Sequence, residues 1–114
     1  MRMIERFDGD AGRRLLVDAL TKQKMVSGNA PLAETLAELV TLRELVPGEV
    51  LIAEEAADND LYLVLSGVLD IVVKGTKIAQ RTTNDVVGEM AAVDPTLRRS
   101  AAVLAVTEAL VAKL

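Results

Sequence analysis

The 114-residue sequence contains neither histidine nor cysteine. Ser-His-Asp and Cys-His catalysis are therefore excluded, and so are metal centres that depend on histidine or thiolate ligands. The lack of cysteine also rules out disulfides, which fits the cytoplasm, and we expect a cytoplasmic protein. We predict a chain that is not an enzyme, with no metal site and no cofactor.

Aromatic residues are scarce as well, and acidic residues outnumber basic ones. Phe7 and Tyr62 are the only aromatic residues, and the net charge is −4. Such a chain offers little surface for stacking bases and little attraction for phosphate backbones, so we expect no nucleic-acid binding by this segment. The apolar runs are short and interrupted by charge, and the first six residues mix acid with base. We therefore expect neither a membrane span nor a signal peptide.

Residues 1–39 carry apolar side chains at helical spacing, divided by Gly28-Asn29. We predict a first helix from Asp8 or Asp10 to about Met25, and a second helix that begins at Pro31. Their functional interpretation is a lever that moves when a ligand binds, and the simpler interpretation is two helices packed on a barrel. The predicted buried stripes are Leu15, Leu16, Ala19 and Leu20 in the first helix, and Leu32, Leu36 and Leu39 in the second.

From residue 40 the pattern changes from helical to alternating. Short apolar runs are separated by the turn signals Pro47-Gly48, Ser66-Gly67, Lys74-Gly75 and Asn84-Asp85. Short strands at such intervals are typical of a barrel or jelly roll. We predict a mainly β fold with flanking helices, in which a helical segment (1–39) and a β-barrel (40–114) form a single domain.

Residues 87–101 combine the features of an anion site. Gly88 precedes a short apolar run that Pro95 ends after about one helical turn, and a helix start presents unpaired N–H groups to an anion. Arg99 adds a planar cation that can meet two phosphate oxygens at once. Glu89 fits such a site if the ligand also donates a hydroxyl, such as a ribose 2′-OH.

The residues alone leave several of these assignments open. Arg98 and Arg99 are adjacent, so on a strand only one of them faces the pocket. A single glycine is more often a plain turn, and a single glutamate is more often a solvated acid. Ser100 either contacts phosphate or satisfies a nearby backbone group.

The sequence Gly88-Glu89-Met90-Ala91, followed by Arg99-Ser100-Ala101, resembles the phosphate-binding cassette of the cyclic nucleotide-binding domain family. The resemblance is closest to bacterial receptors such as the catabolite activator protein. It extends over about residues 40–114 and implies the β-barrel of that family, preceded here by two helices. Pro47-Gly48-Glu49, Leu61-Tyr62 and Ser66-Gly67 also match the family's turns and strand.

The resemblance implies a role for each residue of the cassette. Glu89 would hold the ribose 2′-OH, and Arg99 and Ser100 would hold the cyclic phosphate together with backbone N–H groups. Arg98 would then be a solvated or partner-facing charge. The remaining cassette residues would shape the segment: Gly88, Ala91 and Ala101 by letting the sugar-phosphate approach the backbone, and Met90 mainly by packing in the core.

Two residues align roughly with the base side of the family's pocket, Ile71 and Arg81. For Arg81, a solvated arginine at a strand edge is the simpler interpretation. The chain also departs from the family pattern in three places. Glu55 and Asn84 replace customary glycines, and Val87 replaces an aromatic residue or isoleucine; of these, asparagine tolerates a left-handed backbone.

These observations predict a receptor domain that binds a 3′,5′-cyclic mononucleotide and relays binding through its helices to an effector C-terminal to this chain. One effector is a TIR-type NAD-cleaving domain, as in bacterial antiphage receptors that respond to cyclic UMP or CMP, and the N-terminal helices favour it. The alternatives are the cyclic AMP- or GMP-binding part of a transcription regulator, a ligand-free dimerisation scaffold, and a cupin-like enzyme that uses carboxylates and lysines. A homodimer is compatible with the receptor and the scaffold.

Overall fold

The computed structural model describes residues 3–56, 60–88, 99 and 101–114. The chain begins with a 3-10 helix, η1 (Met3–Phe7), and two α-helices, α1 (Gly9–Thr21) and α2 (Ala30–Leu39). The described strands that follow are β1 (Thr41–Leu45), β2 (Val50–Ile52), β3 (Tyr62–Ser66), β4 (Val68–Val73), β5 (Thr76–Thr82), β6 (Val86–Val87), β7 (Ala102–Ala105) and β8 (Ala109–Lys113). The predicted fold class, mainly β with flanking helices, is confirmed.

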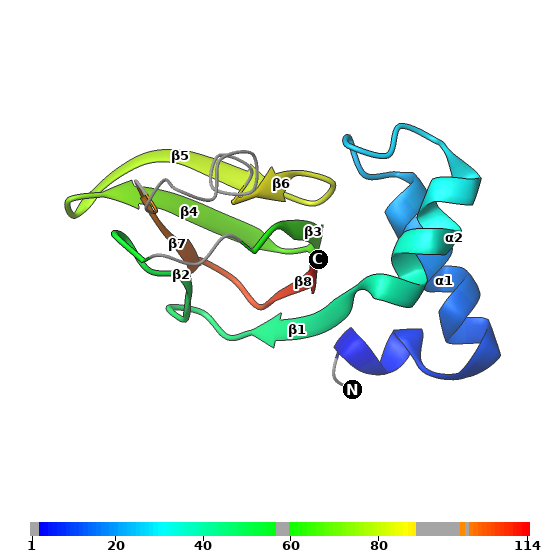
Figure 1. The fold of residues 1–114 in the computed structure, drawn as a ribbon. Coiled ribbons are helices and arrows are strands. Elements are labelled where there is room, and N and C mark those ends of the chain that lie inside the picture. The colour runs from blue at the N-terminus through cyan, green and yellow to red at the C-terminus, as the bar shows by residue number, and fades with distance from the viewer. Residues whose placement is uncertain (1–2, 57–59, 89–98, 100) are drawn as a thin grey trace.

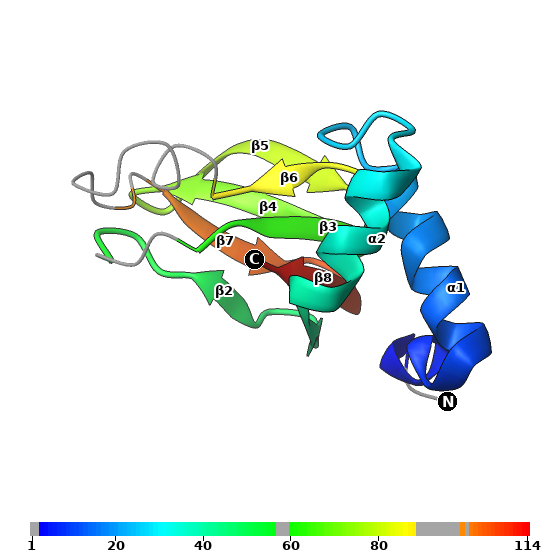
Figure 2. The ribbon, with the colours of Figure 1, turned by 45° about the vertical axis from the view of Figure 1, so that its right-hand side comes forward.

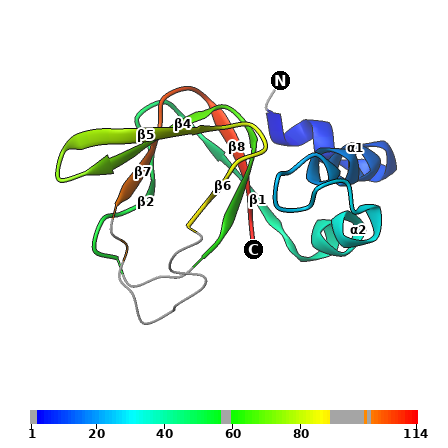
Figure 3. The same ribbon diagram turned by 90° about the horizontal axis from the view of Figure 1, so that it is seen from above.

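The strands form two four-stranded antiparallel sheets. The first sheet has the order β1-β8-β3-β6 and the second has the order β2-β7-β4-β5. The two sheets face one another as a flattened barrel, and the helices lie outside it on the side of the first sheet (Figures 1 and 3). The molecule therefore has three layers, with the first sheet in the middle (Figure 3), and α2 lies on the side of β3 and β8 (Figure 2).

Strands β3 and β8 are buried on both faces because they lie in this middle layer. Tyr62 and Val64 of β3 point into the space between the sheets, and Leu63 and Leu65 point toward the helices. Successive residues of a strand alternate between its faces, so one strand supplies both apolar clusters. The inner cluster comprises Leu45, Leu51, Ile52, Tyr62, Val64, Leu69, Val87, Val103, Ala105, Ala109 and Val111. The outer cluster comprises Leu16, Leu20, Val26, Ala33, Ala37, Leu63, Leu65, Leu110 and Ala112.

The predicted helix α1 is four residues too long at its C-terminal end. The helix ends at Thr21, whose carbonyl accepts the N–H of Gly28 at 3.0 Å, and residues 22–28 form turns. Asp8 occupies the N-cap position, but its side chain makes no capping hydrogen bond. Helix α2 starts one residue before Pro31, and the Asn29 carboxamide caps it by accepting the N–H of Leu32 at 3.1 Å.

The predicted leucine stripe of α2 is confirmed only for Leu36, which is partly buried and packs against the outer cluster. The buried residues of α2 are Ala33 and Ala37, whereas Leu32 and Leu39 are 39% and 66% exposed. Small residues let a helix approach its neighbour closely, and here they face the outer cluster. In α1 the buried leucines are Leu16 and Leu20, and the predicted Leu15 is 52% exposed.

Candidate functional site

The structure brings Gly88 and Arg99 into direct contact. Gly88 follows β6 and Arg99 precedes β7, and one guanidinium nitrogen of Arg99 (Nη1) donates to the Gly88 carbonyl at 3.1 Å. The second nitrogen (Nη2) donates to the Asp60 carbonyl at 2.6 Å. The predicted residues Glu89, Met90, Ala91 and Ser100 lie outside the described residues.

Arg99 is buried, with 5% of its surface exposed. Its backbone is fixed as well, because its N–H donates to the Ala56 carbonyl at 2.9 Å and its carbonyl accepts the Glu55 N–H at 2.7 Å. Burying a guanidinium is costly unless its donors are satisfied, and the Gly88 and Asp60 carbonyls accept from two of them. The site therefore holds a cation in a fixed position, which suits an anionic ligand.

Only glycine fits at position 88. Its backbone has a φ of +89°, and an added Cβ would lie 2.6 Å from the Asp60 carbonyl oxygen and 2.9 Å from Arg99 Nη1. Such contacts are far below van der Waals separation. The absence of a side chain at Gly88 therefore allows Arg99 and the Asp60 carbonyl to meet there.

Two of the noted departures from the family pattern occur where the backbone is left-handed. Glu55 has a φ of +68° and Asn84 has a φ of +76°, so both residues adopt a conformation that glycine adopts more easily. Glu55 also donates its N–H to the Arg99 carbonyl. The backbone is therefore left-handed at both positions although neither residue is glycine.

The other described candidates, Ile71, Arg81 and Ala101, lie at different distances along the second sheet. Ile71 of β4 is opposite Val103 of β7, close to Ala101, and it packs against the inner cluster. Arg81 is opposite Leu69, which in turn pairs with Ala105 at the far end of β7. Arg81 Nη1 donates to the Gln80 carbonyl at 2.9 Å. The strand register therefore places Ile71 nearer to Ala101 than Arg81 is.

Asp60 was not among the site residues predicted from the sequence. Its carbonyl accepts from Arg99, and its carboxylate lies 3.7 Å from Lys113 Nζ at the end of β8. A main-chain acceptor leaves no signal in the sequence, because every residue carries a carbonyl.

The turn between β5 and β6, which precedes Gly88, is bound to the connection between the helices. Lys24, in the connection between α1 and α2, donates its N–H to the Asn84 carbonyl at 3.1 Å and its ammonium to Asp85 Oδ1 at 2.5 Å. Asp85 Oδ2 accepts the Thr82 N–H at 2.8 Å. The Lys24 hydrogen bond, then the Thr82 N–H, lower the pKa of Asp85 against the opposing effect of burial.

The described residues contain no cluster of acidic side chains that could hold a metal ion. None of the described helices has the length and apolar character needed to cross a bilayer. The arrangement suits reversible binding of an anion at Arg99.

Comparisons with known proteins agree with this geometry. The family model of the cyclic nucleotide-binding domain matches residues 42–114. The chain is 51% identical over 112 residues to the Pycsar effector protein BcPycTIR of Burkholderia cepacia, and 43% identical over 113 residues to PaPycTIR of Pseudomonas aeruginosa. These matches cover 98% and 99% of this chain but 37% of each relative, so the chain spans little more than a third of their length.

Solved structures with the same fold include regulatory subunits of protein kinase A. The cAMP-bound PfPKA-R structure matches with a TM-score of 0.83 at 19% identity, over 90% of this chain and 36% of that one. The regulatory subunit of a cAMP-independent protein kinase A from Trypanosoma brucei matches with a TM-score of 0.82 at 26% identity, over 90% and 38% of the two chains.

Proposed function

Because the chain belongs to the cyclic nucleotide-binding domain family, we propose that it senses a 3′,5′-cyclic mononucleotide and relays binding to an effector outside residues 1–114. The buried guanidinium of Arg99, held against Gly88, is the observation that carries this proposal. A receptor regulates only if its two states differ in ligand affinity. The contact of the helices with the turn before Gly88 is our candidate for that difference.

The proposed ligand contacts follow the cassette. Arg99 and Ser100 bind the cyclic phosphate, Glu89 accepts the ribose 2′-OH, and the small residues Ala91 and Ala101 admit the sugar-phosphate. Met90 belongs to the core side of the cassette. For the base side we propose Ile71, with Arg81 as the weaker candidate because it pairs with Leu69, two residues along β4 from Ile71.

For the whole protein, we propose a TIR-type antiphage effector that responds to cyclic UMP or CMP in the cytoplasm. The relatives that support this class are Pycsar effector proteins whose names carry TIR, at 51% and 43% identity over nearly the whole chain. The alternatives are the cyclic AMP- or GMP-binding part of a transcription regulator and a ligand-free dimerisation scaffold. In the first alternative residues 1–114 bind a nucleotide, and in the second they bind a second copy of the chain.

Titration of the chain with cyclic AMP, GMP, CMP and UMP tests the proposal. A ligand that binds only the folded state stabilises it, by about 2.7 kcal/mol at one hundred times its Kd. For a domain of this size, that corresponds to a rise in Tm of about 10 °C. We expect the pyrimidine nucleotides to act at the lowest concentrations. No shift with any of the four favours the scaffold, and formation of a linear nucleotide favours an enzyme.

Variants of Arg99 test the site itself. Arg99→Met leaves the phosphate charge unpaired and is expected to weaken nucleotide binding by about 2–5 kcal/mol, measured by calorimetry. Arg14→Met removes an equal charge from an exposed position of α1, which has no proposed nucleotide contact, and is the matched control. The unfolding midpoint of each unliganded variant, compared with that of the parent, shows whether the variant is folded, so that a loss of binding is not mistaken for unfolding. Equal affinities of the two variants would remove Arg99 from the site.

A further inference from the structure

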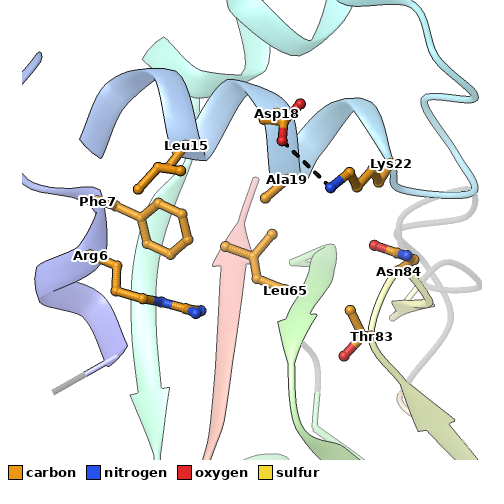
Figure 4. Close-up of a pocket in the computed structure, with 9 residues that line it drawn as sticks. All are labelled: Arg6, Phe7, Leu15, Asp18, Ala19, Lys22, Leu65, Thr83 and Asn84. Atoms are coloured by element: carbon orange, nitrogen blue, oxygen red, sulfur yellow. Dashed lines mark ion pairs between the residues drawn. The ribbon is translucent and has the colours of Figure 1, made fainter. Parts of the chain in front are cut away.

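A cavity of about 360 Å³ lies between the helices and the barrel. Its walls come from four parts of the chain: η1, α1, β3 and the turn between β5 and β6 (Figure 4). Of the described residues predicted to bind nucleotide, none lines it. Its volume falls within the range of small-molecule sites in proteins.

The interior of the cavity is apolar. The Phe7 ring, Leu15, Ala19 and Leu65 face it from three of its walls (Figure 4). Leu15 belongs to the apolar side of α1, yet it is 52% exposed because nothing in the described chain covers it at this rim. An apolar body placed here would bury Leu15 and Phe7 together, which is favourable because both leave water.

Positive charge reaches the cavity from both ends. The Arg6 guanidinium lies 5.5 Å from the centroid of the Phe7 ring and, among the described residues, has no ion pair. Lys22 Nζ lies at the other end, 3.5 Å from Asp18 Oδ2, with both side chains about two-thirds exposed. An exposed ion pair of this kind is weak, so Lys22 is available to a second anion. The charged groups of the cavity, two cations and one carboxylate, leave a net charge of +1.

We propose that this cavity is a second binding site, for a small amphipathic anion that carries an apolar ring or chain and one acidic group. The apolar body would occupy the space among Phe7, Leu15 and Leu65. The acidic group would meet the planar donor fork of Arg6, with Lys22 as the second cation. Asp18 disfavours ligands that carry several negative charges, which separates this class from nucleoside polyphosphates.

Naphthalene-2-sulfonate is a suitable probe because it joins an apolar double ring to one anionic group. We expect saturable shifts of the amide resonances of Phe7, Ala19, Lys22 and Asn84 in a ¹⁵N-resolved NMR titration of the 114-residue chain. A ligand of this size that fits moderately well binds with a Kd of about 1 mM. The neutral analogue 2-naphthalenemethanol measures the apolar contribution alone.

Charge-removing variants decide the assignment. Arg6→Met is expected to weaken sulfonate binding about fivefold or more while leaving the neutral analogue unchanged, and Lys22→Met is expected to act in the same direction. Arg14→Met is the matched control, because Arg14 is an exposed arginine of α1 that does not line this cavity. The amide spectrum of each free variant shows whether it folds.

Several results would overturn the proposal. They are the absence of saturation up to about 10 mM probe, shifts centred on Gly88 and Ala101, and equal losses for Arg6→Met and Arg14→Met. Nucleotide titration is a separate measurement on separate residues. The second site therefore stands or falls independently of the cyclic nucleotide site.

Discussion

Gly88 sets the distance between its own carbonyl and the Arg99 guanidinium. In Gly88→Ala, the left-handed backbone costs about 1–2 kcal/mol, and the new Cβ collides with the Asp60 carbonyl and Arg99. We expect a total loss of about 2–4 kcal/mol, since at least one hydrogen bond of a charged group is also disturbed. Denaturant unfolding of the variant and the parent measures this loss of stability. Gly75→Ala is the control, because Gly75 has a φ of +80° with open space around its Cβ, so it loses only the backbone contribution. Equal losses would mean that the close packing at Gly88 is unimportant.

Gln23 is the one described side chain with a buried polar atom that lacks a partner. It is 1% exposed, its Nε2 donates to the Val64 carbonyl at 2.9 Å, and its Oε1 has no partner among the described residues. The Val64 carbonyl also accepts the Asn84 N–H at 2.8 Å, so it stays satisfied without Gln23. We expect Gln23→Met, which keeps the shape, to be neutral or to stabilise by about 1 kcal/mol in thermal unfolding. A loss above about 1 kcal/mol would indicate that Oε1 has a hydrogen-bond partner, such as an ordered water.

At the residue scale, the sequence predicts side chains better than main-chain contacts. The motif predicted that Gly88 and Arg99 belong to one site, and in the structure the two residues are in contact. Glu55 and Asn84 were noted as replacements for glycine, and both have positive φ. The contribution of the Asp60 carbonyl could not be predicted, because its position depends on how a loop folds against Arg99.

Among the elements, the strands were easier to predict than the buried faces of the helices. Turn residues mark the ends of most strands, so the succession of short strands along the chain could be predicted from the sequence. Strand β6 has only two residues and was missed. In α2 the large leucines suggested the buried side, but close packing selected Ala33 and Ala37. Which side of an apolar helix is buried depends on the shape of its neighbour, and a periodicity alone does not contain that shape.

The ion pair between Lys24 and Asp85 joins the helical layer to the turn before the cassette. We expect Asp85→Asn to cost about 1–2 kcal/mol at neutral pH, since it weakens two hydrogen bonds to a carboxylate that is only 14% exposed. The folded-state pKa of Asp85 lies below its ordinary value of 3.8. Its contribution is therefore full above that value and is lost as the pH falls through the lower, folded-state pKa.

Denaturant unfolding of the parent and the variant between neutral and acidic pH measures this dependence. The two stabilities are expected to converge at the acidic end. Asp18→Asn is the control, because its pair with Lys22 is exposed and contributes at most a few tenths of a kcal/mol. A pH-independent difference between Asp85→Asn and the parent would exclude the ion pair as its cause.

Across the whole molecule, the first sheet belongs to two apolar clusters at once, so the helices and the barrel are expected to unfold together. Removal of residues 1–39 would expose Leu63, Leu65 and Leu110, each now at most 7% exposed. Each leucine contributes about 1.5–3 kcal/mol by burial, and together they approach the entire stability of a typical domain. We therefore expect residues 40–114 alone to lose near-ultraviolet circular dichroism and to aggregate. We also expect the 114-residue chain to show equal calorimetric and van't Hoff enthalpies. Two separate transitions, or a folded 40–114 fragment, would instead make the change from helix to strand near residue 40 a true domain boundary.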